Sequence, residues 1–229
     1  MERVPLFLRP MVLVWQAYGR VFVGIQAVAL AVGAAYFCIP EVRGAAEVAA
    51  GWKREGGAWF AAWTSMLFGG VIPELLKWKL RPAGLPAPRA VEVVHQIGIF
   101  GIGGVMVDVF YRQQAAWFGD SAGWGVVVLK IVVDQGLYSL FVANPIAVLW
   151  FLWREQGFDP VKTVKACRWA VLKARTLQIW TTGLVFWTPL LGVLYALPAA
   201  LQFVAFLFAL TAWGIVLVFI ARRQVAGGL

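Results

Sequence analysis

Charged residues are scarce in this chain of 229 residues. Asp, Glu, Lys and Arg together make up 14% of it, whereas they form about a quarter of a typical soluble domain. Hydrophobic residues reach 62%, and most of the thirteen Trp residues lie near the ends of long apolar runs. This composition excludes an ordinary soluble domain and predicts an integral membrane protein.

Residues that carry out chemistry are few as well. The single histidine, His95, and the two cysteines, Cys38 and Cys167, lie too far apart for a metal-ligand motif or a disulfide framework. The chain has no Ser/His/Asp arrangement, no H-E-x-x-H and no phosphate-binding glycine loop. Asp108 and Asp134 are the only candidates for a catalytic pair of carboxyls, and they lack the neighbours found in intramembrane aspartyl proteases. We therefore expect no enzymatic activity, no metal and no cofactor.

The chain carries an excess of basic residues, which gives it a formal net charge of +9. A nucleic-acid-binding protein would gather such residues on one face, but here they fall in short segments between apolar runs. That distribution is typical of membrane topology, because positive residues stay on the side from which a chain is inserted. We therefore expect no nucleic acid partner.

Six apolar runs predict an all-α integral membrane protein, a six-span helical bundle that forms one domain over residues 1–229. Residues 41–57 carry three acids and three bases, and we expect them to form a solvated or interfacial connection. The fourth run is too long for a straight span, so it must tilt or break, and Asn144-Pro145 is the expected break. The six predicted spans cover approximately residues 21–39, 58–76, 91–110, 124–153, 177–197 and 199–221.

The basic residues also predict an orientation. Six spans with the N-terminus inside leave most Lys and Arg residues on the inner side, so we expect both termini on the cytoplasmic side. A basic amphipathic helix over residues 158–175, capped by Asp159 and Pro160, is expected at the surface that carries anionic lipids. The Ala/Gly/Arg-rich composition favours a bacterial inner membrane over a mitochondrial inner or peroxisomal membrane.

Three polar residues interrupt the fourth apolar run: Lys130, Asp134 and Gln135. Lys130 and Asp134 stand four residues apart on one helix face, where they can pair and offset much of the cost of burying two charges. Two interpretations stay open. The motif is either a polar constriction or ion-pair gate on a solute path, or a structural clamp that joins helices.

Asp108 lies within the third apolar run. It can line the same cavity as the motif, pair with Lys130 in place of Asp134, or reach the surface if the span is shifted. The same run contains glycines at positions 98, 101, 103 and 104, which let a neighbouring backbone approach closely and favour a homo-oligomer.

Three further polar residues are accessory candidates. We expect His95 to be a hydrogen-bonded residue near the membrane interface rather than a proton switch. Asn144 and Gln202 are expected to satisfy backbone groups near Pro145 and Pro198, or to contact a solute.

Three motif regions resemble the Mpv-seventeen and 22-kilodalton peroxisomal membrane protein family: Gly101-Ile-Gly-Gly104 with Phe110-Tyr111, Lys130-Ile-Val-Val-Asp134-Gln135, and Pro198 followed by Trp213. The resemblance covers about residues 98–223 and makes this chain a divergent, bacterial-type member. It implies a channel-forming or metabolite-permeability role and adds Tyr111 to the accessory candidates. The chain departs from the family pattern at Val105, Asp108, Phe110 and Gln202, where the family has Pro, His, Trp and Arg.

Together these patterns predict a channel or channel-like permeation protein for a small solute or ion that the sequence does not identify. The alternative is a non-transporting membrane scaffold or partner-binding protein in which the motif is a structural clamp. The predicted polar centre comprises Lys130, Asp134, Gln135 and Asp108, and the accessory candidates are Asn144, Gln202, Tyr111 and His95.

Overall fold

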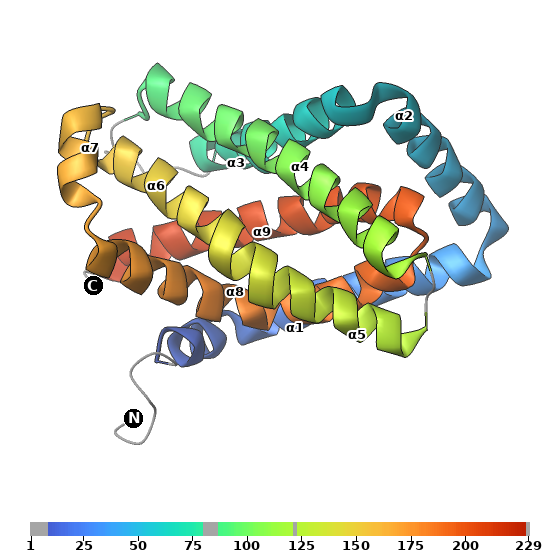
Figure 1. Ribbon diagram of the computed structural model, residues 1–229. Coiled ribbons are helices and arrows are strands. Elements are labelled where there is room, and N and C mark those ends of the chain that lie inside the picture. The colour runs from blue at the N-terminus through green and yellow to red at the C-terminus, as the bar shows by residue number, and fades with distance from the viewer. Residues whose placement is uncertain (1–8, 80–86, 121–122, 228–229) are drawn as a thin grey trace. The chain divides into compact units, whose positions relative to one another are not determined.

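A computed structural model describes residues 9–79, 87–120 and 123–227, and the side chains of residues 9–11, 13, 14, 17, 18, 77 and 214–227 lie outside this description. Within these ranges the chain forms helices and no strand, so the prediction of an all-α fold is confirmed (Figure 1). The chain divides into two compact units. Unit 1 comprises residues 1–31 and 121–196, and unit 2 comprises residues 32–120 and 197–229.

Five helical stretches are long and apolar enough to cross a membrane. The length and composition of these helices are those of a helical membrane protein. The sixth predicted span falls on α9 (Ala199–Gly227), whose part with described side chains, Ala199–Trp213, is shorter than a span. The rest of that span and both chain ends lie outside the described side chains, so the six-span count and the orientation stay predictions. The five stretches are Gly19–Cys38, Pro40–Leu76, Ala90–Phe118, Trp124–Glu155 and Trp169–Ala196.

Unit 1 is built on most of α1 and on all helices between residues 124 and 196. Many of its buried side chains are apolar, and the rings of Phe22 and Phe186 meet edge to face at 5.5 Å between centroids. Gln26 of α1 donates a hydrogen bond of 2.8 Å to the Phe186 carbonyl, in the turn before Pro189. The elements of unit 1 are α1 (Arg9–Cys38), α5 (Trp124–Val133), the π-helix η3 (Asp134–Ala143), α6 (Asn144–Glu155), α7 (Pro160–Ala166) and α8 (Trp169–Ala196).

The predicted break at Asn144-Pro145 is wrong, because the helix runs on from Trp124 to Glu155. The π-helical segment η3 lies directly before Pro145, and the Asn144 N–H donates to the Ser139 carbonyl five residues back. A wider turn shifts the hydrogen-bond ladder by one residue, which accommodates a proline that has no N–H to give.

The single helix predicted over residues 158–175 is also wrong. The structure ends α7 at Ala166 and begins α8 at Trp169, well before the predicted span start at residue 177. Cys167 has φ −77° and ψ 61°, and the Arg168 N–H donates to the Ala166 carbonyl at 2.9 Å, which is an inverse γ-turn. The predicted cap is confirmed, because the Asp159 carboxylate accepts hydrogen bonds from two backbone N–H groups of α7.

Unit 2 contains a close helix contact that the glycines of the third run predicted. A Cβ atom on Gly104 of α4 would overlap the Ser65 side chain and lie 2.7 Å from the Ala61 carbonyl oxygen, and one on Gly101 would overlap Met66. A Cβ atom on Gly98 or Gly103 would meet no described residue within 4 Å. The predicted close approach of a neighbouring backbone is thus confirmed at Gly104, while Gly101 makes room for a side chain. The elements of unit 2 are α2 (Pro40–Ser65), the π-helix η2 (Met66–Val71), α3 (Ile72–Lys79), α4 (Ala90–Phe118) and α9, together with the last turns of α1.

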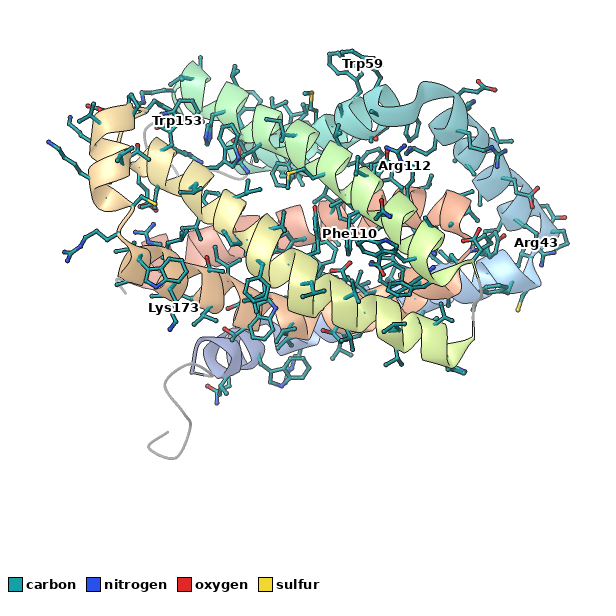
Figure 2. The ribbon with its side chains drawn as sticks, viewed as in Figure 1. Arg43, Trp59, Phe110, Arg112, Trp153 and Lys173 are labelled. Atoms are coloured by element: carbon teal, nitrogen blue, oxygen red, sulfur yellow. The ribbon has the colours of Figure 1, made fainter. Side chains whose placement is uncertain are left out.

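Residues 41–57, which were predicted to form a solvated or interfacial connection, are helical, and five of their six charged side chains are exposed. They form the first half of α2, which kinks at Gly57, where φ is 52° and ψ is −131°. Ala50 is 2% exposed and packs against Leu197 and Leu201 of unit 2. Contacts with a segment remote in sequence therefore stabilise this helix, while Trp59, beyond the kink, points outward and is 75% exposed (Figure 2).

Candidate functional site

The predicted Lys-Asp-Gln motif is buried in unit 1. Lys130 lies near the end of α5, is 1% exposed and is one of the largest fully buried side chains among the described residues. Asp134 and Gln135 are the first two residues of η3 and are 5% and 8% exposed. Polar groups so deeply buried must bond to one another or to the backbone.

Three side-chain donors surround the carboxylate of Asp134. Its Oδ1 atom accepts hydrogen bonds from Gln135 Nε2 at 3.1 Å and from Ser139 Oγ at 3.2 Å. Its Oδ2 atom accepts one from the Tyr195 hydroxyl at 2.5 Å. Two donors come from η3 itself and the third from α8, so this carboxylate joins two helices of unit 1.

Tyr195 contacts both ionisable residues of the motif. Its side chain is 1% exposed, its hydroxyl bonds to Asp134, and the Lys130 ammonium lies 5.9 Å from the centroid of its ring. An ammonium at this distance from an aromatic ring is attracted by the negative potential of the ring face. A direct Lys130–Asp134 ion pair stays a prediction.

A second bond from α8 supports the start of η3. The indole N–H of Trp180 donates to the Gln135 carbonyl at 2.7 Å. We call Lys130, Asp134, Gln135, Ser139, Tyr195 and Trp180 the Asp134 network. Sequence reasoning missed both aromatic members, which lie 61 residues from Asp134 and 45 residues from Gln135. The only signal was that Tyr and Trp seek hydrogen-bond partners when they are buried.

Asp108 lies in unit 2, in a second buried polar cluster. It is 2% exposed, so the alternative of a surface position is wrong. Its Oδ1 atom lies 2.8 Å from Lys53 Nζ of α2, and its Oδ2 atom lies 3.2 Å from Arg112 Nη2, one turn along α4. The ionic partners of Asp108 within unit 2 are thus Lys53 and Arg112, while pairing with Lys130 and a cavity shared with the motif stay predictions.

Lys53 was missed because its neighbours in sequence suggested a solvated connection. Its side chain is 11% exposed, and its ammonium lies 5.4 Å from the centroid of the Phe203 ring. Arg112 differs, since its side chain is 64% exposed and reaches outward. The cluster therefore combines one buried carboxylate with one buried and one exposed cation.

The accessory candidates have different surroundings. Gln202 donates a 3.0 Å hydrogen bond to the carbonyl of Leu197, the residue before Pro198, so its predicted backbone role is confirmed. Asn144 is half-buried at the end of η3. Tyr111 is 4% exposed and packs edge to face on an aromatic ring of α9, and His95 is buried near the start of α4. The interfacial role of His95 stays a prediction.

No group of three or more His, Cys, Asp or Glu residues lies close enough to hold a metal ion among the residues that the structure describes. Comparisons with protein-family models, curated proteins and solved structures find no match for this chain. The class that fold and site define is therefore a helical membrane protein with a buried polar network in each of two compact units.

Proposed function

We propose that this protein is a channel-like permeation protein for small solutes or ions, and that the Asp134 network is a closed constriction on the solute path. The observation that carries the proposal is the burial of Lys130 and Asp134 within the candidate span Trp124–Glu155. Each such charge costs about 2.5–3.5 kcal/mol to insert, and charges retained at that depth commonly mark a solute or ion pathway. The resemblance to the Mpv-seventeen family supports the same function.

The chemistry of the network suits a constriction. The Lys130 ammonium attracts anions, while the Tyr195 and Ser139 hydroxyls and the Gln135 amide can replace water around a passing solute. Hydrogen bonds from Tyr195 to Asp134 and from Trp180 to the Gln135 carbonyl join α8 to η3, so the proposed path opens when both bonds break. The proposed gate is this pair of contacts.

A second candidate is a non-transporting scaffold or partner-binding protein. The observation in its favour is that the Asp134 carboxylate already accepts three side-chain hydrogen bonds. With the Trp180 bond, α8 is attached to η3 at two points, as a structural clamp requires. In this candidate the motif fixes helix packing and no solute passes.

Solute and ion flux across proteoliposomes that contain the purified protein distinguishes the two candidates. We expect flux through the wild-type protein, and a changed rate or selectivity for Lys130→Ala and Asp134→Ala variants that still elute as folded protein. Arg20→Ala removes an exposed charge of the same unit and serves as the matched control. Absence of flux through well-folded wild-type protein would favour the clamp.

We also propose the finer arrangement: six spans, both termini on the cytoplasmic side, and a bacterial inner membrane. The support is the length of α9, 29 residues, together with the basic residues between the spans. A homo-oligomer is proposed because a Cβ atom on Gly98 or Gly103 would meet no described residue within 4 Å, which leaves room for a second copy. The mass of the protein–detergent complex tests the oligomer.

A further inference from the structure

The turn between two candidate spans of unit 1 is confined to one surface of the membrane. One span ends at Glu155 and the next begins at Trp169, so residues 156–168 cannot leave that surface. In Figure 1 the short helix α7 connects α6 to α8 at this end of unit 1. Side chains exposed here meet lipid headgroups as well as water.

The two acidic side chains at this turn form ion pairs with nearby basic residues. The Glu155 carboxylate lies 2.8 Å from the Arg175 guanidinium. The Asp159 carboxylate caps α7 and lies 3.6 Å from the Lys162 ammonium. Hydrogen bonds from the backbone N–H groups of Lys162 and Val161, with the nearby Lys162 charge, lower the pKa of Asp159 and keep its carboxylate ionised.

Three further basic residues of this region are not paired with these acids. Lys165, Arg168 and Lys173 are exposed and form no ion pair with any residue that the structure describes. Lys173 lies on the first turns of α8 (Figure 2). The turn therefore presents positive charge that its own acids do not neutralise, and anions complement it.

Large apolar side chains stand beside these cations. Val161 and Val164, three residues apart on one face of α7, are 61% and 74% exposed, and Trp169 at the start of α8 is 75% exposed. Trp is enriched where the hydrocarbon core meets the headgroups. A free phosphate ion would use only the cations, whereas a phospholipid uses the cations and the apolar residues together.

We propose that residues 161–173 form a binding site for an anionic phospholipid. Lys165, Arg168 and Lys173 bind the phosphate and headgroup, while Val161, Val164 and Trp169 contact the upper part of the acyl chains. The site lies in unit 1, apart from the Asp134 network, and does not depend on the proposed channel function.

Native mass spectrometry of the full-length protein in detergent tests the site. The protein is offered equal amounts of phosphatidylglycerol and phosphatidylcholine, and the ratio of the two bound lipids is measured. We expect phosphatidylglycerol to be enriched on the wild type and this enrichment to fall about thirty-fold in Lys165→Gln/Arg168→Gln, since each basic residue near a surface contributes about 1 kcal/mol.

Three control variants are compared under the same conditions. Arg20→Gln/Arg54→Gln removes the same charge from exposed positions on α1 and α2 and should keep the enrichment. Lys165→Arg/Arg168→Lys conserves the charge and should keep it too. Val161→Ser/Val164→Ser should reduce retention of both lipids with little change in their ratio.

Three results would overturn the proposal. The first is equal binding of the two lipids by the wild type. The second is an equal loss of enrichment in the Lys165/Arg168 and Arg20/Arg54 variants, which would place the preference elsewhere. The third is displacement of phosphatidylglycerol by added inorganic phosphate at the same concentration, which would make the site one for soluble phosphate.

Discussion

At the scale of single residues, the Tyr195 hydroxyl is the contact that joins α8 to the buried carboxylate of Asp134. Tyr195→Phe removes this hydroxyl and leaves one buried carboxylate oxygen without its donor. We expect the free energy of unfolding to fall by about 1–3 kcal/mol, the usual cost of an unsatisfied buried group. Thermal and denaturant unfolding of the purified protein in detergent measures the change.

Tyr36→Phe is the matched control, because it removes a hydroxyl that makes no hydrogen bond with the described residues. Tyr36 is half-buried and lies in unit 2. Its substitution should change stability by less than about 0.5 kcal/mol. Equal stability of the two variants would mean that the Tyr195 hydroxyl contributes nothing to packing.

The Lys53–Asp108 ion pair gives a second prediction at this scale. Lys53→Met leaves the carboxylate of Asp108 buried without its closest cation, 2.8 Å away, and should cost about 3–5 kcal/mol. The double variant Lys53→Met/Asp108→Leu should recover most of that loss, because two apolar side chains replace two charges. Unfolding of the two single variants and the double variant completes the cycle.

Arg54→Met is the control for this cycle. Arg54 follows Lys53 directly in sequence but is exposed, so its loss should change stability by less than about 0.5 kcal/mol. A double variant as unstable as the sum of its singles would show that the two side chains do not interact.

At the scale of elements, the contact of α4 with α2 depends on individual glycines. Gly104→Ala places a methyl group against Ser65 and the Ala61 carbonyl and should destabilise the protein by about 1–3 kcal/mol. Gly103→Ala, one residue earlier, faces open space and should be neutral or stabilise the helix by up to about 1 kcal/mol. Thermal unfolding compares the two, and similar melting temperatures would contradict the close approach.

Much of the helical architecture could be predicted from the sequence, because apolar runs set where helices can lie in a membrane. The Asp159 cap and the packing glycines were also predictable, since each depends on local geometry. The π-helix η3 was not, because hydrophobic pattern does not encode how wide a helical turn is. Helix formation over residues 41–57 depends on burial of Ala50 against α9, which no local pattern reveals.

The same limit applies to the distant residues that bind the predicted polar residues. The sequence places Lys130, Asp134 and Gln135 together because they lie within two turns of one helix. Tyr195 and Lys53 contact residues far along the chain, and such contacts depend on how helices pack. Single-sequence patterns identify a residue that needs a partner, but they do not say which distant residue supplies it.

At the scale of the whole molecule, the two cysteines report on topology. The proposed orientation puts Cys38, at the end of the first span, outside and Cys167, between the fourth and fifth, on the cytoplasmic side. Cys38 is exposed and Cys167 is half-buried. A membrane-impermeant maleimide should label Cys38 in intact cells, and Cys167 only after permeabilisation.

Single-cysteine variants, Cys38→Ser and Cys167→Ser, assign each signal to one site. Labelling of Cys167 in intact cells, with Cys38 protected, would reverse the orientation. Labelling of both from outside would contradict the odd number of spans between them.

The reversal potential of reconstituted protein in a planar bilayer under a salt gradient tests the central claim most directly, because selectivity does not change when a structural clamp is merely weakened. If the Asp134 network lines the path, wild-type protein conducts, and Lys130→Met shifts the reversal potential towards cation selectivity by removing a buried positive charge. The exposed Arg20→Met control leaves it unchanged. Folded wild-type protein that carries no current, or a conducting Lys130→Met variant with the wild-type reversal potential, would contradict the account.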